Sequence, residues 1–174
     1  MDKGEEPKII TSSSTKEEIS SFFSFKYNIS QEVQDNIKKE DISGDILLDL
    51  VDNDFKKIGL KIGPIKKIRK YLGEIKSNFP EKSIEEKIDA SSTVEEVKDF
   101  FEKSIGFKID SEFDGKKLLE LKDKDIQDLG LNLGQRKKLE KYLKHFKSIN
   151  SEKKKKAINQ DALIEKDLKK EKLI

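Results

Sequence analysis

An internal repeat is the strongest constraint on this chain of 174 residues. Residues 44–76 align with residues 115–147 without a gap, and 15 of the 33 aligned pairs are identical. Upstream, residues 14–23 match residues 92–101 at a shift of 78 instead of 71. A repeat of this length predicts two small domains instead of one larger domain.

Local signals within each copy predict short helices. Thr15 and Glu18 have the spacing of a capping box, as have Thr93 and Glu96 in the second copy. Gly59 stands where the apolar pattern of a short helix stops, and Gly130 does the same in copy two. Glycine at such a place favours the left-handed backbone that ends a helix.

One longer helix closes each copy. Gly63 and Pro64 are predicted to open this helix in copy one, because proline is tolerated at the first helical position. Apolar residues at helical spacing then predict a buried stripe, formed by Ile65, Ile68, Leu72 and Ile75 in copy one and by Leu139, Leu143 and Phe146 in copy two. Arg136 stands where copy one has Ile65, so the second long helix begins with a more polar residue.

The two copies differ between the first helix and the aligned glycine, where copy two is seven residues shorter. Copy one is predicted to form a second helix there, with Val33 and Ile37 facing inward, and copy two a shortened one. The predicted fold is all-α, with two small helical bundles in tandem. Its segments are a disordered N-terminus (1–13), domain 1 (14–76), a linker with a possible helical turn (77–91), domain 2 (92–147) and a disordered Lys-rich tail (148–174).

The combined pattern resembles the sterile alpha motif (SAM) family. It consists of a first helix with an apolar pair, the sequence I-x-G-x-x-L-L-x-L, a D-[LIF]-x-x-[LI]-G-[IL] segment and a glycine that opens a basic helix. The residues that carry it are Ile42, Gly44, Leu47, Leu48, Leu50, Asp54, Phe55, Ile58, Gly59, Leu60 and Gly63 in copy one, and Phe113, Gly115, Leu118, Leu119, Leu121, Asp125, Ile126, Leu129, Gly130, Leu131, Gly134 and Arg136 in copy two. The chain departs from the family in having no Trp and in placing Ile65 at the position of the usual Arg.

Charge is segregated along the chain although the net charge is only +2. Residues 40–54 contain six acids and no base, and residues 56–76 contain eight bases and one acid. Copy two shows the same order less sharply, acidic on balance over residues 110–128 and basic from Arg136. Charge runs of this kind are commonly solvated faces, and that interpretation stays open.

The resemblance implies a second interpretation, because SAM domains commonly join head to tail, an acidic middle surface against the basic start of a last helix. Transferred by position, the acidic surface comprises Asp41, Asp45, Asp49, Asp52 and Asp54 in copy one and Asp114, Glu120, Asp123, Asp125 and Asp128 in copy two. The helix-end surface comprises Lys61, Gly63, Pro64, Lys66, Lys67 and Lys70 in copy one and Leu133, Gly134, Gln135, Arg136, Lys137 and Lys141 in copy two. The two copies are expected either to dock within one chain or to propagate between chains.

The sequence offers no catalytic constellation. His145 stands alone, there is no cysteine nucleophile and no phosphate-binding glycine loop. The close carboxylate pairs at 52/54 and 123/125 are expected to be helix-start residues and not metal ligands. We therefore expect a protein that is not an enzyme and needs no cofactor or metal.

The expected function is a non-catalytic adaptor or scaffold that associates with itself or with another SAM-containing protein. The alternative is binding of an RNA hairpin through the basic start of the last helix of domain 2, with Arg136 and Lys137 as phosphate contacts. The run from Lys153 to Lys156 could also serve as an import signal or contact an acidic membrane. With no cysteine and no long apolar run, the expected location is the cytoplasm, with the nucleus not excluded.

Overall fold

A computed structural model describes residues 8–79, 88–110 and 112–151 of the chain. Every regular element in these ranges is helical and no strand is present, which confirms the predicted all-α class. The possible helical turn within residues 80–87 and most of the Lys-rich tail, residues 152–174, lie outside the described residues.

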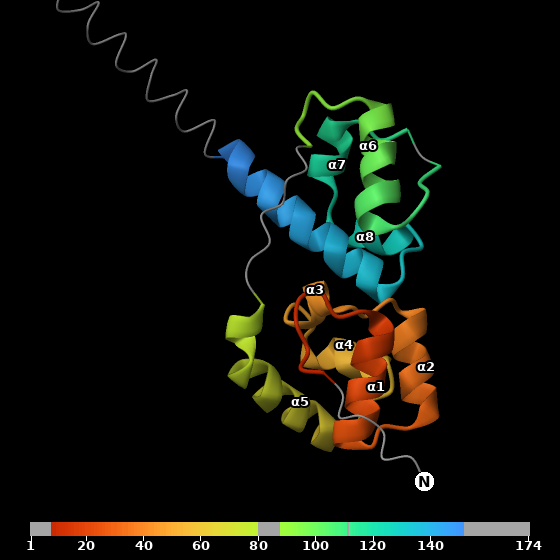
Figure 1. Ribbon diagram of the computed structural model, residues 1–174. Helices are drawn as coiled ribbons and strands as arrows, with labels where there is room; N and C mark the ends of the chain where they lie inside the picture. Colours follow the sequence, from red (N-terminus) through yellow and green to blue (C-terminus); the bar gives the residue numbers. More distant parts are fainter. Residues whose placement is uncertain (1–7, 80–87, 111, 152–174) are drawn as a thin grey trace, which may run out of the picture.

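The N-terminal bundle consists of residues 8–79. Its elements are α1 (Lys16–Tyr27), α2 (Gln31–Lys39), α3 (Gly44–Leu47), α4 (Asp52–Lys57), α5 (Ile62–Glu74) and the 3-10 turn η1 (Lys76–Asn78). The C-terminal bundle has α6 (Val94–Phe100), the π-helical turn η2 (Phe101–Ile105), α7 (Gly115–Glu120), α8 (Asp123–Asp128) and a last helix described over residues 133–151, here called the C-terminal helix. The bundles lie one above the other in Figure 1, and each encloses its own cluster of buried apolar side chains.

The predicted caps and stops are confirmed. Thr15 and Glu18 form both hydrogen bonds of a capping box, at 2.9 and 3.2 Å, and Thr93 and Glu96 repeat them at 2.8 and 3.3 Å. Gly59 and Gly130 have φ angles of 95° and 73°, so they adopt the left-handed backbone that other residues avoid. These four helix boundaries therefore follow from local sequence.

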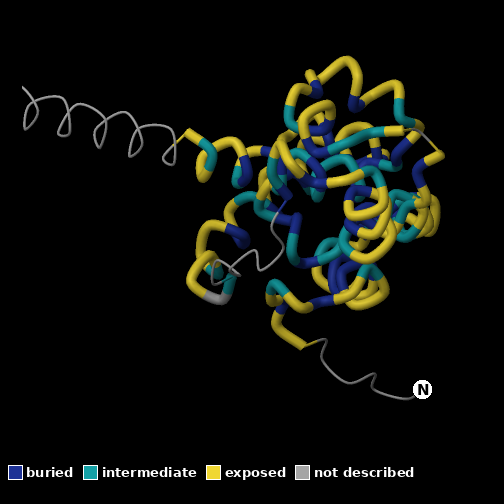
Figure 2. The backbone as a smooth tube through the Cα atoms, turned by 90° about the horizontal axis from the view of Figure 1, so that it is seen from above, coloured by how far each residue is buried: buried dark blue, intermediate teal, exposed yellow. Residues whose placement is uncertain are grey.

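The buried stripes of the long helices are confirmed as well, except at Ile75, which follows the last residue of α5 and is only half-buried. Ile65, Ile68 and Leu72 are at most 3% exposed, as are Leu139, Leu143 and Phe146. Buried residues lie on the inner sides of the helices, and exposed residues lie outside (Figure 2). One detail differs, because α5 begins at Ile62, so that Pro64 is its third residue. The first four N–H groups of a helix have no partner within the helix, and proline is tolerated there too.

Both bundles begin earlier than predicted. Ile10 is 1% exposed within the first core and Ile88 is 7% exposed within the second, so residues 10–13 do not belong to a disordered terminus. The chain between each of these residues and the first helix passes close to an aligned glycine. A Cβ on Gly44 would lie 2.0 Å from the Thr11 carbonyl oxygen, and a Cβ on Gly115 would lie 1.8 Å from that of Asp89. Both glycines are needed for close packing, in the same place in each copy.

The largest difference between the bundles is the second helix. Copy one has α2, whereas the described residues 107–110 and 112–114 of copy two are not helical. The predicted short helix is therefore absent from these residues, which is consistent with the seven-residue deletion. At the other end, residues 148–151 continue the C-terminal helix and are not part of a separate tail.

Candidate interaction site

The start of the C-terminal helix lies against the N-terminal bundle, beside the region of α2 and α3 (Figure 1). Leu133, its first residue, is 4% exposed and belongs to the core cluster of the N-terminal bundle. Burying a leucine side chain contributes about 1.5 to 3 kcal/mol. Leu133 is thus an apolar anchor between the two bundles.

Two backbone groups of the same helix start are satisfied by Glu40, at the end of α2. The N–H of Leu133 donates to the Glu40 carboxylate at 2.7 Å, and the N–H of Gly134 donates to the Glu40 carbonyl oxygen at 2.7 Å. The first N–H groups and last carbonyls of helices lack partners within their own helix. Here the positive end of the C-terminal helix dipole meets the negative end of the α2 dipole. The N–H groups of the one helix and the carbonyl at the end of the other therefore gain partners.

Gly134 permits this approach because it has no side chain. A Cβ there would lie 2.2 Å from the Asp41 carbonyl oxygen and 2.7 Å from that of Glu40. The φ angle of Gly134 is not left-handed, so space and not backbone conformation requires glycine. Gly63 is the aligned residue in copy one, and a Cβ on it would meet nothing within 4 Å.

Three lysines of the C-terminal helix complete the contact. Lys137 lies 3.2 Å from Asp54, with side-chain exposures of 16% and 7%, and also 3.3 Å from Glu140 of its own helix. Towards the edge, Lys138 pairs with Asp41 at 3.4 Å, and Lys141 pairs with Asp49 at 3.5 Å and donates to the Asp45 carbonyl oxygen at 2.9 Å. The Lys141–Asp49 pair is 48% and 45% exposed, and such pairs contribute about 0 to 1 kcal/mol, so the more desolvated Lys137–Asp54 and Lys138–Asp41 pairs matter more for specificity.

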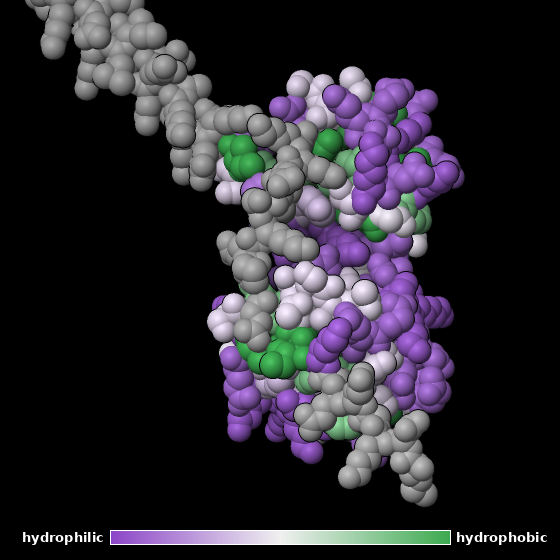
Figure 3. Space-filling model, in the orientation of Figure 1, coloured by the Kyte–Doolittle hydropathy of each residue, from purple (hydrophilic) through white to green (hydrophobic). Residues whose placement is uncertain are grey.

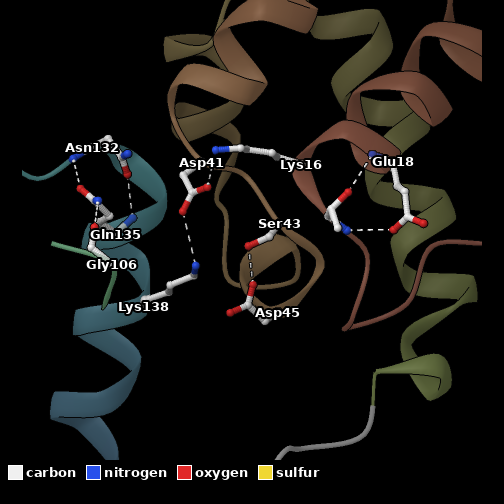
Figure 4. A network of polar contacts seen from close by, with 10 residues as sticks. Lys16, Glu18, Asp41, Ser43, Asp45, Gly106, Asn132, Gln135 and Lys138 are labelled. Carbon is white, nitrogen blue, oxygen red and sulfur yellow. Dashed lines mark hydrogen bonds and ion pairs between the residues drawn. The ribbon is translucent and has the colours of Figure 1, made fainter. Parts of the chain in front are cut away.

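The pKa values of two residues reflect this contact. Burial alone would lower the pKa of Lys137, but the hydrogen bond to Asp54 and the charges of Glu140 and Asp54 outweigh burial and raise it. Burial alone would raise the pKa of Asp41, but the hydrogen bond to Lys16 and the charge of Lys138 outweigh burial and lower it. Figure 4 shows Asp41 between these two lysines. Both pKa shifts mean that the contact stabilises the charged forms of these residues.

We refer to Leu133, Gly134, Lys137, Lys138 and Lys141 as the docked helix end, and to Glu40, Asp41, Asp45, Asp49 and Asp54 as the acidic face. The structure brings together eight residues that the sequence predicted for the two surfaces, namely Asp41, Asp45, Asp49 and Asp54 with Leu133, Gly134, Lys137 and Lys141. Hydrophilic side chains are visible at the junction of the bundles in Figure 3.

Three predicted residues of these surfaces have partners within their own bundle instead. Asp52 pairs with Arg69 at 2.9 Å. Gln135 exchanges backbone-to-side-chain hydrogen bonds with Asn132 and donates to the Gly106 carbonyl, as Figure 4 shows. Arg136 donates to the Leu131 carbonyl at 3.5 Å.

Sequence reasoning missed Glu40 and Lys138. Glu40 is the first acid of the acidic run, but only the end of α2 makes its backbone carbonyl available. Lys138 lies four residues after Gly134, on the same side of the helix, and this spacing could have identified it.

The remaining predicted surfaces are not in contact with each other. Lys61, Gly63, Lys66, Lys67 and Lys70 at the start of α5 are exposed, Pro64 is half-buried, and none of these lysines has an ion pair among the described residues. In copy two, Asp114 and Asp125 accept backbone N–H groups of Lys117 and Lys122, and Glu120, Asp123 and Asp128 are exposed. Lys116, Lys117, Lys122 and Lys124 lie among these acids.

Within the described ranges, no group of three or more His, Asp or Glu residues is placed to hold a metal ion. The same residues include no helix long and apolar enough to cross a membrane. Comparisons with protein-family models, with curated proteins and with solved structures gave no match. The resemblance to SAM domains therefore remains a prediction from the residues.

Proposed function

We propose that this protein is a non-catalytic interaction module, an adaptor or scaffold built from two SAM-like bundles that recognise acidic protein surfaces through helix ends. The observation that carries the proposal is the internal contact. It combines an apolar anchor, two backbone hydrogen bonds, a glycine without space for a side chain and a desolvated ion pair. A contact with these components has the composition of a specific protein–protein interface.

The same contact argues against RNA binding at the start of the C-terminal helix. Lys137 is 16% exposed and already has two carboxylate partners, and Arg136 is half-buried. Tyr142 and Phe146 pack in the core of the C-terminal bundle and are not available as stacking platforms. A phosphate would have to displace the acidic face to reach this helix start.

The test is to make the internal contact form between two chains. One chain carries Leu133→Asp, which frees its acidic face, and the other carries Glu40→Lys and Asp49→Lys, which frees its helix end. Both also carry Lys66→Glu and Lys67→Glu, so that the start of α5 cannot contribute.

Light scattering should give 20.1 kDa for each chain alone and twice that mass for the mixture. Neither chain changes Asp41, so its ion pair with Lys138 can form between the two chains without a further substitution. A mixture that stays at the mass of one chain, with both chains folded by circular dichroism, would refute the interaction function.

A further inference from the structure

We propose that, among its described residues, this chain has one free helix end, the start of α5, and no free acidic surface that could accept such a helix end. It would therefore bind one partner protein through α5 and end a series of such contacts instead of extending it. This inference rests on the proposed function. It adds the partner's surface chemistry and the direction of binding.

The internal contact serves as a template for the start of α5. At the shift of 71 residues, each component of the docked helix end has a chemically similar counterpart, namely Ile62 for Leu133, Gly63 for Gly134, Lys66 for Lys137, Lys67 for Lys138 and Lys70 for Lys141. We refer to these counterparts as the free helix end. Both sets begin a long helix, α5 at Ile62 and the C-terminal helix at Leu133.

The free helix end has the exposure of an unoccupied interface. Ile62 is 62% exposed, whereas Leu133 is 4% exposed. Lys66, Lys67 and Lys70 are exposed without an ion pair among the described residues. Figure 1 places the start of α5 at the end of the N-terminal bundle that faces away from the junction, so a partner can approach it.

The C-terminal bundle cannot accept this helix end in the same way. The acidic face of the N-terminal bundle can accept a helix end because Glu40, at the end of α2, supplies both its carboxylate and its carbonyl oxygen. The described residues 107–110 and 112–114 contain no corresponding helix. At the same shift of 71, Ser111 replaces Glu40, so the carboxylate that accepts the N–H of Leu133 is lost. Lys116 replaces Asp45 and adds a positive charge, whereas Asp114 at the position of Ser43 returns one carboxylate.

A second copy of the chain is also a poor acceptor, because its own docked helix end covers its acidic face. Eight residues connect residue 79 with residue 88, and a short linker gives an effective concentration of about millimolar for an internal contact. The expected occupant is therefore a different protein. Its surface would resemble the acidic face, with several carboxylates around the end of a helix, an accessible carbonyl oxygen and an apolar pocket for Ile62.

The chain itself supplies a probe with this chemistry once its internal contact is opened. Leu133→Asp frees the acidic face and leaves the free helix end intact, and Gly134→Ala is a second opening variant that needs no new charge. The light-scattering mass of either opened chain should grow with concentration, because α5 of one copy binds the acidic face of the next.

Two controls make the assignment specific. The wild-type chain should stay at 20.1 kDa over the same concentrations, and adding it to an opened chain should lower the mean mass, because it occupies an acidic face and offers none. Adding Gly63→Ala to an opened chain should weaken association at least about tenfold, because the new Cβ enters the carbonyls that the template places there. Lys66→Glu with Lys67→Glu should abolish it.

Three results would overturn the inference. A light-scattering mass of the wild-type chain that grows with concentration would show that this chain has a free surface that accepts a helix end. Opened chains that remain monomers would show that α5 does not bind the acidic face. A hairpin RNA that binds the wild-type chain, and is lost with Lys66→Glu and Lys67→Glu, would assign the free helix end to nucleic acid. The proposed function would survive any of these, because its own test silences α5.

Discussion

The starts of α5 and of the C-terminal helix have nearly the same residues but opposite surroundings. Both have an apolar first residue, a glycine and three lysines at identical spacing. One is buried against five carboxylate residues, and the other is exposed. The residues of a helix start therefore do not by themselves determine whether it is docked. The neighbouring surface does, and among the described residues it is supplied by the N-terminal bundle, through the end of α2.

The largest effect is expected from a change of the apolar anchor. Leu133→Asp should undock the bundles, because it removes about 1.5 to 3 kcal/mol of burial and places a carboxylate beside the acidic face. Ile62→Asp, at the aligned and exposed position, should leave docking unchanged. Small-angle scattering of each variant at low concentration would show the difference, as a larger radius of gyration for Leu133→Asp alone. Equal radii would contradict the role of Leu133.

The aligned glycines should respond in opposite directions. Gly134→Ala should destabilise docking by about 1 to 3 kcal/mol, because its Cβ would overlap the carbonyls of Asp41 and Glu40. Gly63→Ala meets nothing and should be neutral or stabilise α5 by up to about 1 kcal/mol. Chemical denaturation of the full chain measures both. If the two variants lose similar amounts of stability, glycine is needed for the helix itself and not for the contact between the bundles.

The acidic residues at the starts of α4 and α8 give a third matched pair. Asp54 and Asp125 both accept a backbone N–H three residues earlier, from Val51 and Lys122, at 2.9 Å. Asp54 additionally pairs with Lys137, so Asp54→Asn should cost about 1 to 3 kcal/mol, and Asp125→Asn about 1 kcal/mol or less. The denaturation midpoints of the two variants would show this difference. If both midpoints shift equally, the whole effect comes from the lost hydrogen bond at the helix start and not from the ion pair with Lys137.

The smallest expected effect is that of pH near neutrality. Asp41 has a lowered pKa, so its contribution is present above its ordinary value of about 3.9 and is lost as pH falls through the lowered value. Lys137 has a raised pKa, so its contribution is present below about 10.4 and is lost only as pH rises beyond that. Docking should therefore be constant between about pH 5 and 9. A marked change within this range would require another titrating group.

Much of the fold could be predicted from local sequence. Capping boxes, terminal glycines and apolar stripes depend on neighbours within a few residues, and these predictions are confirmed at Thr15, Thr93, Gly59 and Gly130. The core positions of Ile10 and Ile88 were missed, although the segments 10–15 and 88–93 share isoleucine and Ser-Thr at the same shift. An isolated isoleucine before a polar stretch is too weak a local signal.

The candidate site could be predicted only in its charges. Alternation of acidic and basic runs indicated two surfaces, and eight predicted residues meet across the junction. Which copy would donate and which would accept depends on the end of α2, on the Glu40 carbonyl and on the space at Gly134. These are properties of the packed backbone. In copy two, the sequence signs that the acceptor surface is lost are the seven-residue deletion and the replacements of Glu40 by Ser111 and of Asp45 by Lys116.

The docked helix end is expected to hold the two bundles in one arrangement, and a distance measured between the bundles tests this directly. Because the chain contains no cysteine, Glu32→Cys in α2 and Lys98→Cys in α6 provide two exposed sites for spin labels, one in each bundle. Pulsed electron resonance should give a single narrow distance distribution for the labelled chain and a broad one after Leu133→Asp. A broad distribution in the chain that retains Leu133 would contradict this expectation.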